Sequence, residues 1–591
     1  MEEFSFGTLS TDDLRLEQLK SQRRGLVHLN RIEPRDPIPG KPVQVFAQSA
    51  SDIDVRQVLC RYTTNGIQPT NDKSIEVKFI QGVVEWDTLN WGYLTTWKAL
   101  IPAQPAGTVV KYQIEALLSD GGESILAEDG RFFSYIVDDL EVPAWAHDAI
   151  IYQIFLDRFY PGSQAAWNAA AGPSDFHGGT IRGVIEKLNY LSDLGINCLW
   201  LSPCFPSPSH HGYDATDLYS IEPRLGSLDD LEELISEAHR RGIRVLLDFV
   251  VNHISNQHPI FREAAASKSS KYHSWFSWNK WPDEYDTFFG VRELPEINIA
   301  HPDVRKYMID AALFWVNEYH VDGFRLDYAH GVPHDFWVDF RQATKAVNPD
   351  LWMFGEIVET AELQRSFEGR LDGSLDFLLL QALRGVFAFN SWDLKKFDAF
   401  LNAHETFFPA TFSRPSFLDN HDMNRFFWAV KGNIAKLRLA ALCQFTLAGA
   451  PIIYYGTEVG LSQDREIWRE DGGFLEESRL PMLWDDAQDE SLLGCYRELI
   501  SLRKAHPVLW NGDRKTLHVN AAEGIYAYSR KDESEELIIV LNNSDSARTV
   551  TLETDLHEDL INRRSYPVRN GSVEIQLAPY SGVVLGKHTD Q

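Results

Sequence analysis

The 591-residue chain is 44% hydrophobic and 24% charged, which is ordinary for a globular protein and long enough for roughly three or four domains. Its net charge of −29 at pH 7 argues against nucleic acid and anionic membranes as partners, because phosphate binding requires patches of Lys and Arg. The five cysteines are scattered without a zinc-binding pattern and no apolar stretch is long enough to span a membrane, so we expect a cytoplasmic protein.

The first 140 residues have the composition of a β domain. Short apolar or alternating runs are separated by Gly and Pro turns, and they lie at residues 43–47, 55–62, 97–102, 109–116 and 132–137. Strands of this length and spacing indicate a β-sandwich. We therefore predict that residues 1–140 form an N-terminal β-sandwich domain that includes a short leader at its start.

Between residues 141 and 504, short apolar runs alternate with helix-like segments. The eight predicted strands end near residues 155, 202, 251, 327, 356, 377, 419 and 455. This repetition of strand and helix predicts a (β/α)8 TIM barrel. A doubly wound open sheet is the alternative, but no GxGxxG loop follows the first strand.

Two further segments complete the predicted architecture. Residues 253–298 interrupt the alternation of predicted strands and helices and are rich in Trp, Tyr and His. They therefore indicate an inserted subdomain after the third strand. After residue 505 the chain again contains short runs in which apolar and polar residues alternate, as in strands. We therefore predict a C-terminal antiparallel β domain over residues 505–591.

Carboxylates follow several predicted strands, and catalytic groups of such barrels lie at the carboxyl ends of strands. Asp248, Asp327, Glu356 and Asp422 are the main examples. Packing alone explains them poorly, because each buried and unpaired carboxylate costs several kcal/mol. Arg325 lies two residues before Asp327, so both side chains should point to one face of the strand, either as a structural ion pair or to keep a nucleophile ionised.

One ionised and one protonated carboxyl group are the standard apparatus for cleaving a glycosidic bond. The segments that carry this signal lie at residues 211–214, 248–253, 294–298, 323–327, 355–356 and 418–422. Their order and spacing resemble the α-amylase family, glycoside hydrolase family 13, over residues 150–456. The N-terminal β domain and the chain length further resemble the cyclomaltodextrinase, neopullulanase and maltogenic amylase branch.

The resemblance implies a role for each motif residue. Asp327 would be the nucleophile, Glu356 the general acid and then base, and Asp422 would bind the hydroxyls of the distorted sugar. Arg325 would keep Asp327 ionised. The implied substrate-binding residues are Tyr213, which would stack on the sugar, His253 and His421, which would bond its hydroxyls, Arg425, which would bind near Asp422, and His211.

The aromatic insert adds one candidate of its own. Trp278 lies among Trp275, Trp281 and Tyr285, and flat rings of this kind stack on the apolar faces of sugars. The alternative is that these rings form the core of the inserted subdomain.

The predicted function is a retaining glycoside hydrolase that cleaves α-1,4 bonds of malto-oligosaccharides, cyclodextrins, pullulan or starch through a covalent glycosyl-enzyme, with transglycosylation as a side reaction. Two alternatives stay open. One is a glucosyltransferase or isomerase acting on sucrose or trehalose, and the other is an inactive glycan-binding protein on the same fold.

Cofactor and partner predictions follow from the same resemblance. No cofactor is required. Calcium stays an open alternative, but no metal ligand is assigned, because the Asn- and Asp-rich calcium loop of many relatives is not matched after Asp157-Arg158-Phe159, and Thr180 follows Gly178-Gly179. The partner is an α-glucan. The N-terminal domain would either bind glucan or form a homodimer.

Overall fold

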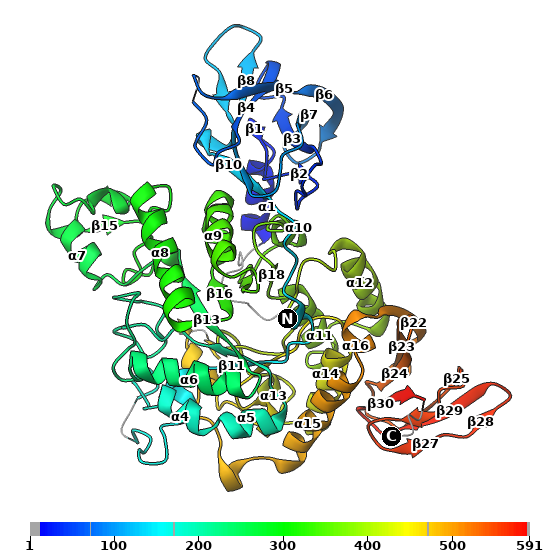
Figure 1. Ribbon diagram of the computed structural model, residues 1–591. Helices are drawn as coiled ribbons and strands as arrows, with labels where there is room; N and C mark the ends of the chain where they lie inside the picture. Colours follow the sequence, from blue (N-terminus) through cyan, green and yellow to red (C-terminus); the bar gives the residue numbers. More distant parts are fainter. Residues whose placement is uncertain (1–11, 71, 170–171, 470–471, 588–591) are drawn as a thin grey trace.

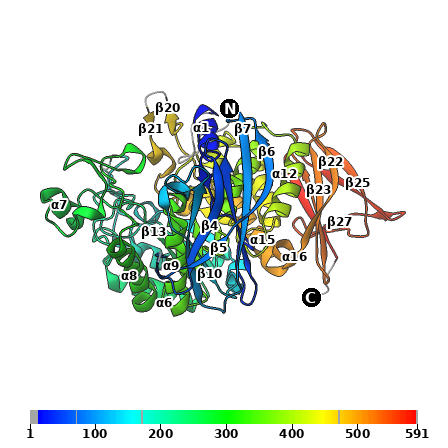
Figure 2. The same ribbon diagram turned by 90° about the horizontal axis from the view of Figure 1, so that it is seen from above.

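The computed structural model describes residues 12–70, 72–169, 172–469 and 472–587. Figure 1 shows an N-terminal β region, a central region of strands and helices, and a C-terminal β region. Figure 2, turned by 90°, shows the C-terminal sheets at one side of the central region and the N-terminal strands in front of it. In the described ranges no helix is long and apolar enough to cross a membrane.

The N-terminal region, which follows helix α1 (Asp12–Ser21), consists of two antiparallel sheets. The main strands of the first sheet are β3 (Val43–Ala50), β7 (Gly92–Ile101) and β6 (Ile80–Asp87). Those of the second are β4 (Val55–Thr63), β8 (Thr108–Leu118) and β10 (Phe133–Val137). Residues alternate between buried and half-buried along β3, and the inward residues of both sheets share one core, as expected for a sandwich.

Charged pairs attach the N-terminal region to the central one. Lys111 of β8 lies 2.9 Å from Asp339 of α9 (His334–Val347), and Arg341 of the same helix lies 3.0 Å from Asp138. Strand β10 packs directly on α9. The sandwich therefore sits beside the helical layer of the barrel.

The central sheet is parallel, in the order β18-β17-β16-β13-β12-β11-β19. These strands are β11 (Ile151–Ile154), β12 (Cys198–Leu201), β13 (Arg244–Val250), β16 (Gly323–Asp327), β17 (Trp352–Gly355), β18 (Gly373–Ser374) and β19 (Ile452–Tyr454). Parallel bridges from Gly373 to Ser413 and from Ser416 to Pro451 place residues 413–416 between β18 and β19. These bridges close the ring, and the predicted (β/α)8 barrel is confirmed.

One glycine is required by the close approach of two barrel strands. Gly323 begins β16 beside Trp352 of β17. A Cβ at position 323 would collide with the Trp352 carbonyl, so a larger residue would push these strands apart. The strand that ends at Asp327 is thus held close to the strand that leads to Glu356.

The insert after β13 contains α7 (Pro259–Ala266) and the hairpin of β14 (Trp278–Lys280) and β15 (Glu284–Tyr285). The C-terminal region has two antiparallel sheets, in the orders β22-β23-β24-β30-β26-β27 and β25-β29-β28. These strands are β22 (Asp513–Asn520), β23 (Ile525–Lys531), β24 (Glu536–Asn542), β25 (Arg548–Glu553), β26 (Glu558–Asp559), β27 (Arg564–Ser565), β28 (Val568–Arg569), β29 (Ser572–Leu577) and β30 (Ser581–Gly586). The predicted inserted subdomain and C-terminal antiparallel β domain are therefore both present.

Candidate active site

Arg325 is the centre of the candidate site. Its side chain is fully buried, and Nη1 donates hydrogen bonds to Asp248 Oδ1 at 2.8 Å and to Asp327 Oδ1 at 2.7 Å. Nη2 lies 2.8 Å from Glu356 Oε1. One guanidinium therefore contacts carboxylates from three neighbouring strands, and it brings Asp327 and Glu356 together as the sequence predicts.

The electrostatics of this cluster favour retention of a proton. Burial raises the pKa of both Asp327 and Glu356, and the Arg325 charge opposes that rise. Burial alone would lower the pKa of Arg325, but Asp248 and Glu356 raise it well above its ordinary value. Since one cation cannot balance three buried carboxylates, we expect the Asp327–Glu356 pair to hold a proton near neutral pH.

Asp422 is held in a different state from that pair. Its Oδ1 accepts a hydrogen bond from Arg479 Nη2 at 2.9 Å, and its Oδ2 lies 3.0 Å from His421 Nε2. Burial alone would raise the pKa of Asp422, but His421 and Arg479 lower it below its ordinary range. Asp422 is therefore a carboxylate at neutral pH.

Arg479 is a site residue that sequence reasoning missed, and it has the place predicted for Arg425. The Arg425 guanidinium lies behind the site, where Nε donates to the Ser478 carbonyl at 2.9 Å and Nη1 to the Tyr455 carbonyl at 2.8 Å. Arg425 thus supports the segment that carries Arg479. No local motif marks Arg479, because its partner Asp422 is 57 residues away in the chain.

Tyr213, His211, His253 and His421 are brought together. The rings of Tyr213 and His421 are stacked with centroids 5.3 Å apart, and the Tyr213 hydroxyl lies 2.7 Å from His421 Nε2. His253 Nε2 donates to the Tyr213 carbonyl at 3.1 Å, and His211 Nδ1 accepts from the Tyr213 amide at 3.1 Å. Burial lowers the pKa of both His211 and His253 to about 3, so both rings are neutral at pH 7.

Trp278, predicted to bind substrate, is half-buried and packs against the core of the inserted subdomain. Its Nε1 donates to the His273 carbonyl at 2.8 Å, and its ring packs against Phe261 and Tyr285. In the β14–β15 hairpin Trp278 pairs with Tyr285. Another ring of the insert, Phe288, lies 4.7 Å from the His253 ring.

Phe288 and its neighbour form an aromatic wall close to the carboxylates. Both Phe288 and Phe289 contact the Tyr328 ring, at centroid distances of 4.9 and 5.4 Å, and Phe289 is 53% exposed. Tyr328 has a left-handed φ of 42°, and its amide donates to Glu356 Oε2 at 3.1 Å. The residue after Asp327 therefore orients Glu356 and joins it to these rings.

The segment after Asp157, which the sequence does not match to a calcium loop, is held by hydrogen bonds within the chain. Asp157 accepts hydrogen bonds from the amides of His177 and Gly178 and pairs with Arg158 at 2.8 Å. Over the described part of the chain, no group of three or more His, Cys, Asp or Glu side chains is arranged to hold a metal ion.

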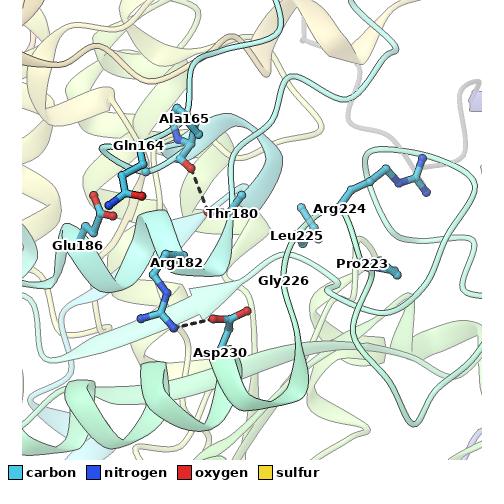
Figure 3. A pocket seen from close by; sticks show the side chains of 12 residues that line it. Gln164, Ala165, Thr180, Arg182, Glu186, Pro223, Arg224, Leu225, Gly226 and Asp230 are labelled. Atoms are coloured by element: carbon cyan, nitrogen blue, oxygen red, sulfur yellow. Dashed lines mark hydrogen bonds and ion pairs between the residues drawn. The ribbon is translucent and has the colours of Figure 1, made fainter.

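A separate hollow of about 440 Å³ lies between α4 (Ile181–Glu186) and α6 (Leu228–Arg240), as Figure 3 shows. Its charged groups pair with one another or with the backbone. Arg182 binds Asp230 at 2.6 Å, and Glu186 accepts from the Ser163 amide at 2.7 Å. The lining includes none of the predicted site residues.

Comparisons with known proteins agree with this geometry. Residues 153–490 match the alpha amylase catalytic domain, and residues 514–584 match the maltogenic amylase C-terminal domain. The chain is 37% identical to Alpha-amylase 2 of Dictyoglomus thermophilum, over 76% of this chain and 78% of that protein. It is 34% identical to Neopullulanase 2 of Thermoactinomyces vulgaris, over 75% and 78%. A solved cyclomaltodextrinase aligns with 95% of this chain and 99% of its own, at 29% identity and a TM-score of 0.71.

Proposed function

This chain belongs to the α-amylase family and is an α-glucan hydrolase, and we propose that it cleaves α-1,4-glucosidic bonds with retention of configuration. The relatives support the hydrolase over the sucrose- or trehalose-directed transferase and over the inactive binding protein. The observation that carries the proposal is the single Arg325 guanidinium in contact with both Asp327 and Glu356. A retaining site needs two such groups about 5–5.5 Å apart.

The proton of this pair belongs on Glu356. Arg325 donates a well-aligned hydrogen bond to Asp327, which favours the ionised form of that carboxyl. Asp422 repels the ionised form of Glu356 and Asp248 repels that of Asp327, so the direct Arg325 hydrogen bond to Asp327 is what distinguishes the two carboxyl groups. The two groups therefore begin the reaction as nucleophile and acid.

The reaction proceeds in two displacements. Asp327 attacks the anomeric carbon while Glu356 gives its proton to the departing glycosidic oxygen, so the C–O bond breaks and a glycosyl ester forms. Glu356 then removes a proton from water, and the water oxygen attacks the anomeric carbon on the face that the leaving group departed from, opposite the ester bond, so that Asp327 is released and the configuration is retained. A sugar hydroxyl in place of that water gives transglycosylation.

The remaining site residues stabilise the charged transition state. Asp422, kept ionised by His421 and Arg479, accepts hydrogen bonds from ring hydroxyls as positive charge develops at the sugar. Tyr213 covers the sugar face, and the neutral His253 and His211 lie behind it. Two carboxyl groups and water supply every proton, so the chemistry requires no cofactor.

Product analysis tests this function. Incubation with maltotriose, β-cyclodextrin, pullulan and sucrose should release reducing sugar from the first three and leave sucrose intact. NMR of the first product formed from maltotriose should show the α-anomer before mutarotation. An initial β-anomer, or turnover of sucrose alone, contradicts the proposal.

The N-terminal domain carries a second proposal, a homodimer. We define the β6 patch as Ile80, Val83, Val84, Trp86 and Trp91, whose exposed fractions are 69, 62, 51, 50 and 77%. It lies on an edge strand, where an uncovered apolar row invites pairing. Because aliphatic and aromatic side chains both contribute, the patch suits a protein surface better than a sugar, and we assign it to a second copy of the chain.

Sedimentation tests the dimer. The wild type should sediment at about twice the monomer mass of 67.5 kDa, whereas Val84→Lys/Trp91→Glu should sediment as a monomer of unchanged activity per site on maltotriose. Leu517→Lys, at a 39% exposed position of β22, is the matched control and should stay dimeric. A monomeric wild type overturns the dimer, and loss of amylose binding by the double variant would assign the patch to glucan.

We also propose a cytoplasmic location. A relative named intracellular maltogenic amylase, from Bacillus subtilis, is 32% identical over 71% of this chain. The proposal also fits five free cysteines, four of them buried.

A further inference from the structure

We propose that Gln153 is a positioning residue of the reaction, which fixes the proton of His421 on Nε2 so that this ring donates toward Asp422. Gln153 lies on β11, on the far side of His421 from the carboxylates, and was not among the residues expected from the motifs. Its side chain is 3% exposed, and Nε2 lies 2.8 Å from His421 Nδ1. The inference rests on the proposed role of Asp422.

The contact is one link in a continuous chain of hydrogen bonds. His421 Nε2 lies 3.0 Å from Asp422 Oδ2 and 2.7 Å from the Tyr213 hydroxyl. That hydroxyl lies 3.0 Å from Asp248 Oδ2, and Asp248 accepts from Arg325. The order is therefore Gln153, His421, Tyr213, Asp248 and Arg325, with Asp422 as a branch at His421.

The two carboxylates decide where the protons lie. Asp422 accepts from Arg479, and Asp248 accepts from Arg325 and from Trp200 Nε1, so the other groups facing these two carboxylates must donate. The Tyr213 hydroxyl gives its single proton to Asp248, and it can then only accept from His421. His421 Nε2 must carry a proton to serve both Asp422 and Tyr213, so in the neutral ring Nδ1 is an acceptor.

An acceptor at Nδ1 requires a donor opposite it, and the Gln153 amide supplies one. Its carbonyl oxygen Oε1 is buried and lacks a hydrogen-bond partner among the described residues. The side chain is therefore oriented so that its NH₂ group donates to His421, while its own acceptor oxygen stays unpaired. Glutamate at position 153 would impose the reverse arrangement, in which Nδ1 donates and Nε2 of the neutral ring is bare.

Several charged or titratable groups surround the ring and enter any dependence on pH. Asp422 and Tyr213 contact Nε2, and Arg479 donates to the His421 carbonyl at 2.8 Å. Glu356 and His211 lie within electrostatic range of His421. All of these groups are present in each of the variants compared below. The ratio of kcat between two variants at one pH therefore reports the effect of the residue at position 153.

The test compares Gln153→Glu and Gln153→Leu with the wild type across pH 5 to 8. Gln153→Leu should lower kcat on maltotriose about 10- to 100-fold at every pH, because the ring loses its fixed orientation. Any ring that carries hydrogen on both nitrogens has Nε2–H whatever residue stands at position 153, so Gln153→Glu should lie closer to the wild type at pH 5 than at pH 8.

A matched control is Gln444→Leu, which removes another buried barrel glutamine that donates only to the carbonyls of Ser416 and Ile452. Its kcat relative to the wild type should not vary with pH. If Gln153→Glu and Gln153→Leu lose kcat equally and independently of pH, Gln153 contributes only to packing, and the proposal is overturned.

A second measurement does not depend on activity. Nitrogen-15 NMR of the histidine-labelled wild type at pH 8, assigned with His421→Gln, should show the Nε2–H tautomer for His421, and Gln153→Glu should show Nδ1–H. An Nδ1–H signal in the wild type overturns the inference even if the enzyme is active. An inactive wild type with the expected tautomer would instead count against the proposed function.

Discussion

Asp327→Asn should lower kcat on maltotriose by about 10⁴-fold or more, because it removes the proposed nucleophile. The amide cannot form the glycosyl ester, and it keeps the approximate shape of the side chain beside Arg325. Reducing-sugar release measures the loss, and circular dichroism checks the fold. Activity within tenfold of the wild type would exclude Asp327 as the nucleophile.

Glu356→Gln serves as the matched control, because it separates the acid from the nucleophile. It should also lose most activity on maltotriose, since the departing sugar oxygen then leaves without a proton. On α-maltosyl fluoride, whose leaving group needs little protonation, formation of the glycosyl-enzyme by Glu356→Gln should largely recover, whereas Asp327→Asn should stay inactive. The same loss in both variants on both substrates would contradict the assigned roles.

Arg325→Met should abolish activity and also destabilise the fold by about 3–5 kcal/mol, because it leaves Asp248, Asp327 and Glu356 without their shared buried cation. Urea unfolding at pH 8 measures the loss. The exposed Arg182, which pairs with Asp230 and Glu233, is the control, and Arg182→Met should cost less than about 1 kcal/mol.

The destabilisation should depend on pH in a defined direction. Burial already raises the pKa of Asp327 and Glu356 in the folded protein, and loss of Arg325 removes the charge that opposes this rise. Groups whose pKa is higher in the folded state favour folding at low pH, and this contribution is lost as the pH rises through the folded-state value. Arg325→Met should therefore be less destabilised at pH 5 than at pH 8, and an equal loss at both values would contradict this account.

The sequence by itself determined the barrel and the identity of its acidic groups. Apolar runs of strand length, each followed by a polar residue such as Asp327 or Glu356, are local patterns, and parallel strands place their carboxyl ends at one rim. Arg325 and Asp327 share a strand face because the strand repeat is two residues. These inferences needed only neighbours in the chain.

Only the tertiary structure decided which distant groups complete the site. Arg479 reaches Asp422 and Gln153 reaches His421 across 57 and 268 residues, and no local repeat encodes such pairings. Trp278 shows the reverse case, since its residue type suits a sugar site but the fold packs its ring against Phe261 and Tyr285 of the insert. The physical reason is that the hydrogen-bond partners and the burial of a side chain depend on which loops the closed barrel brings side by side. That arrangement is a property of the whole chain.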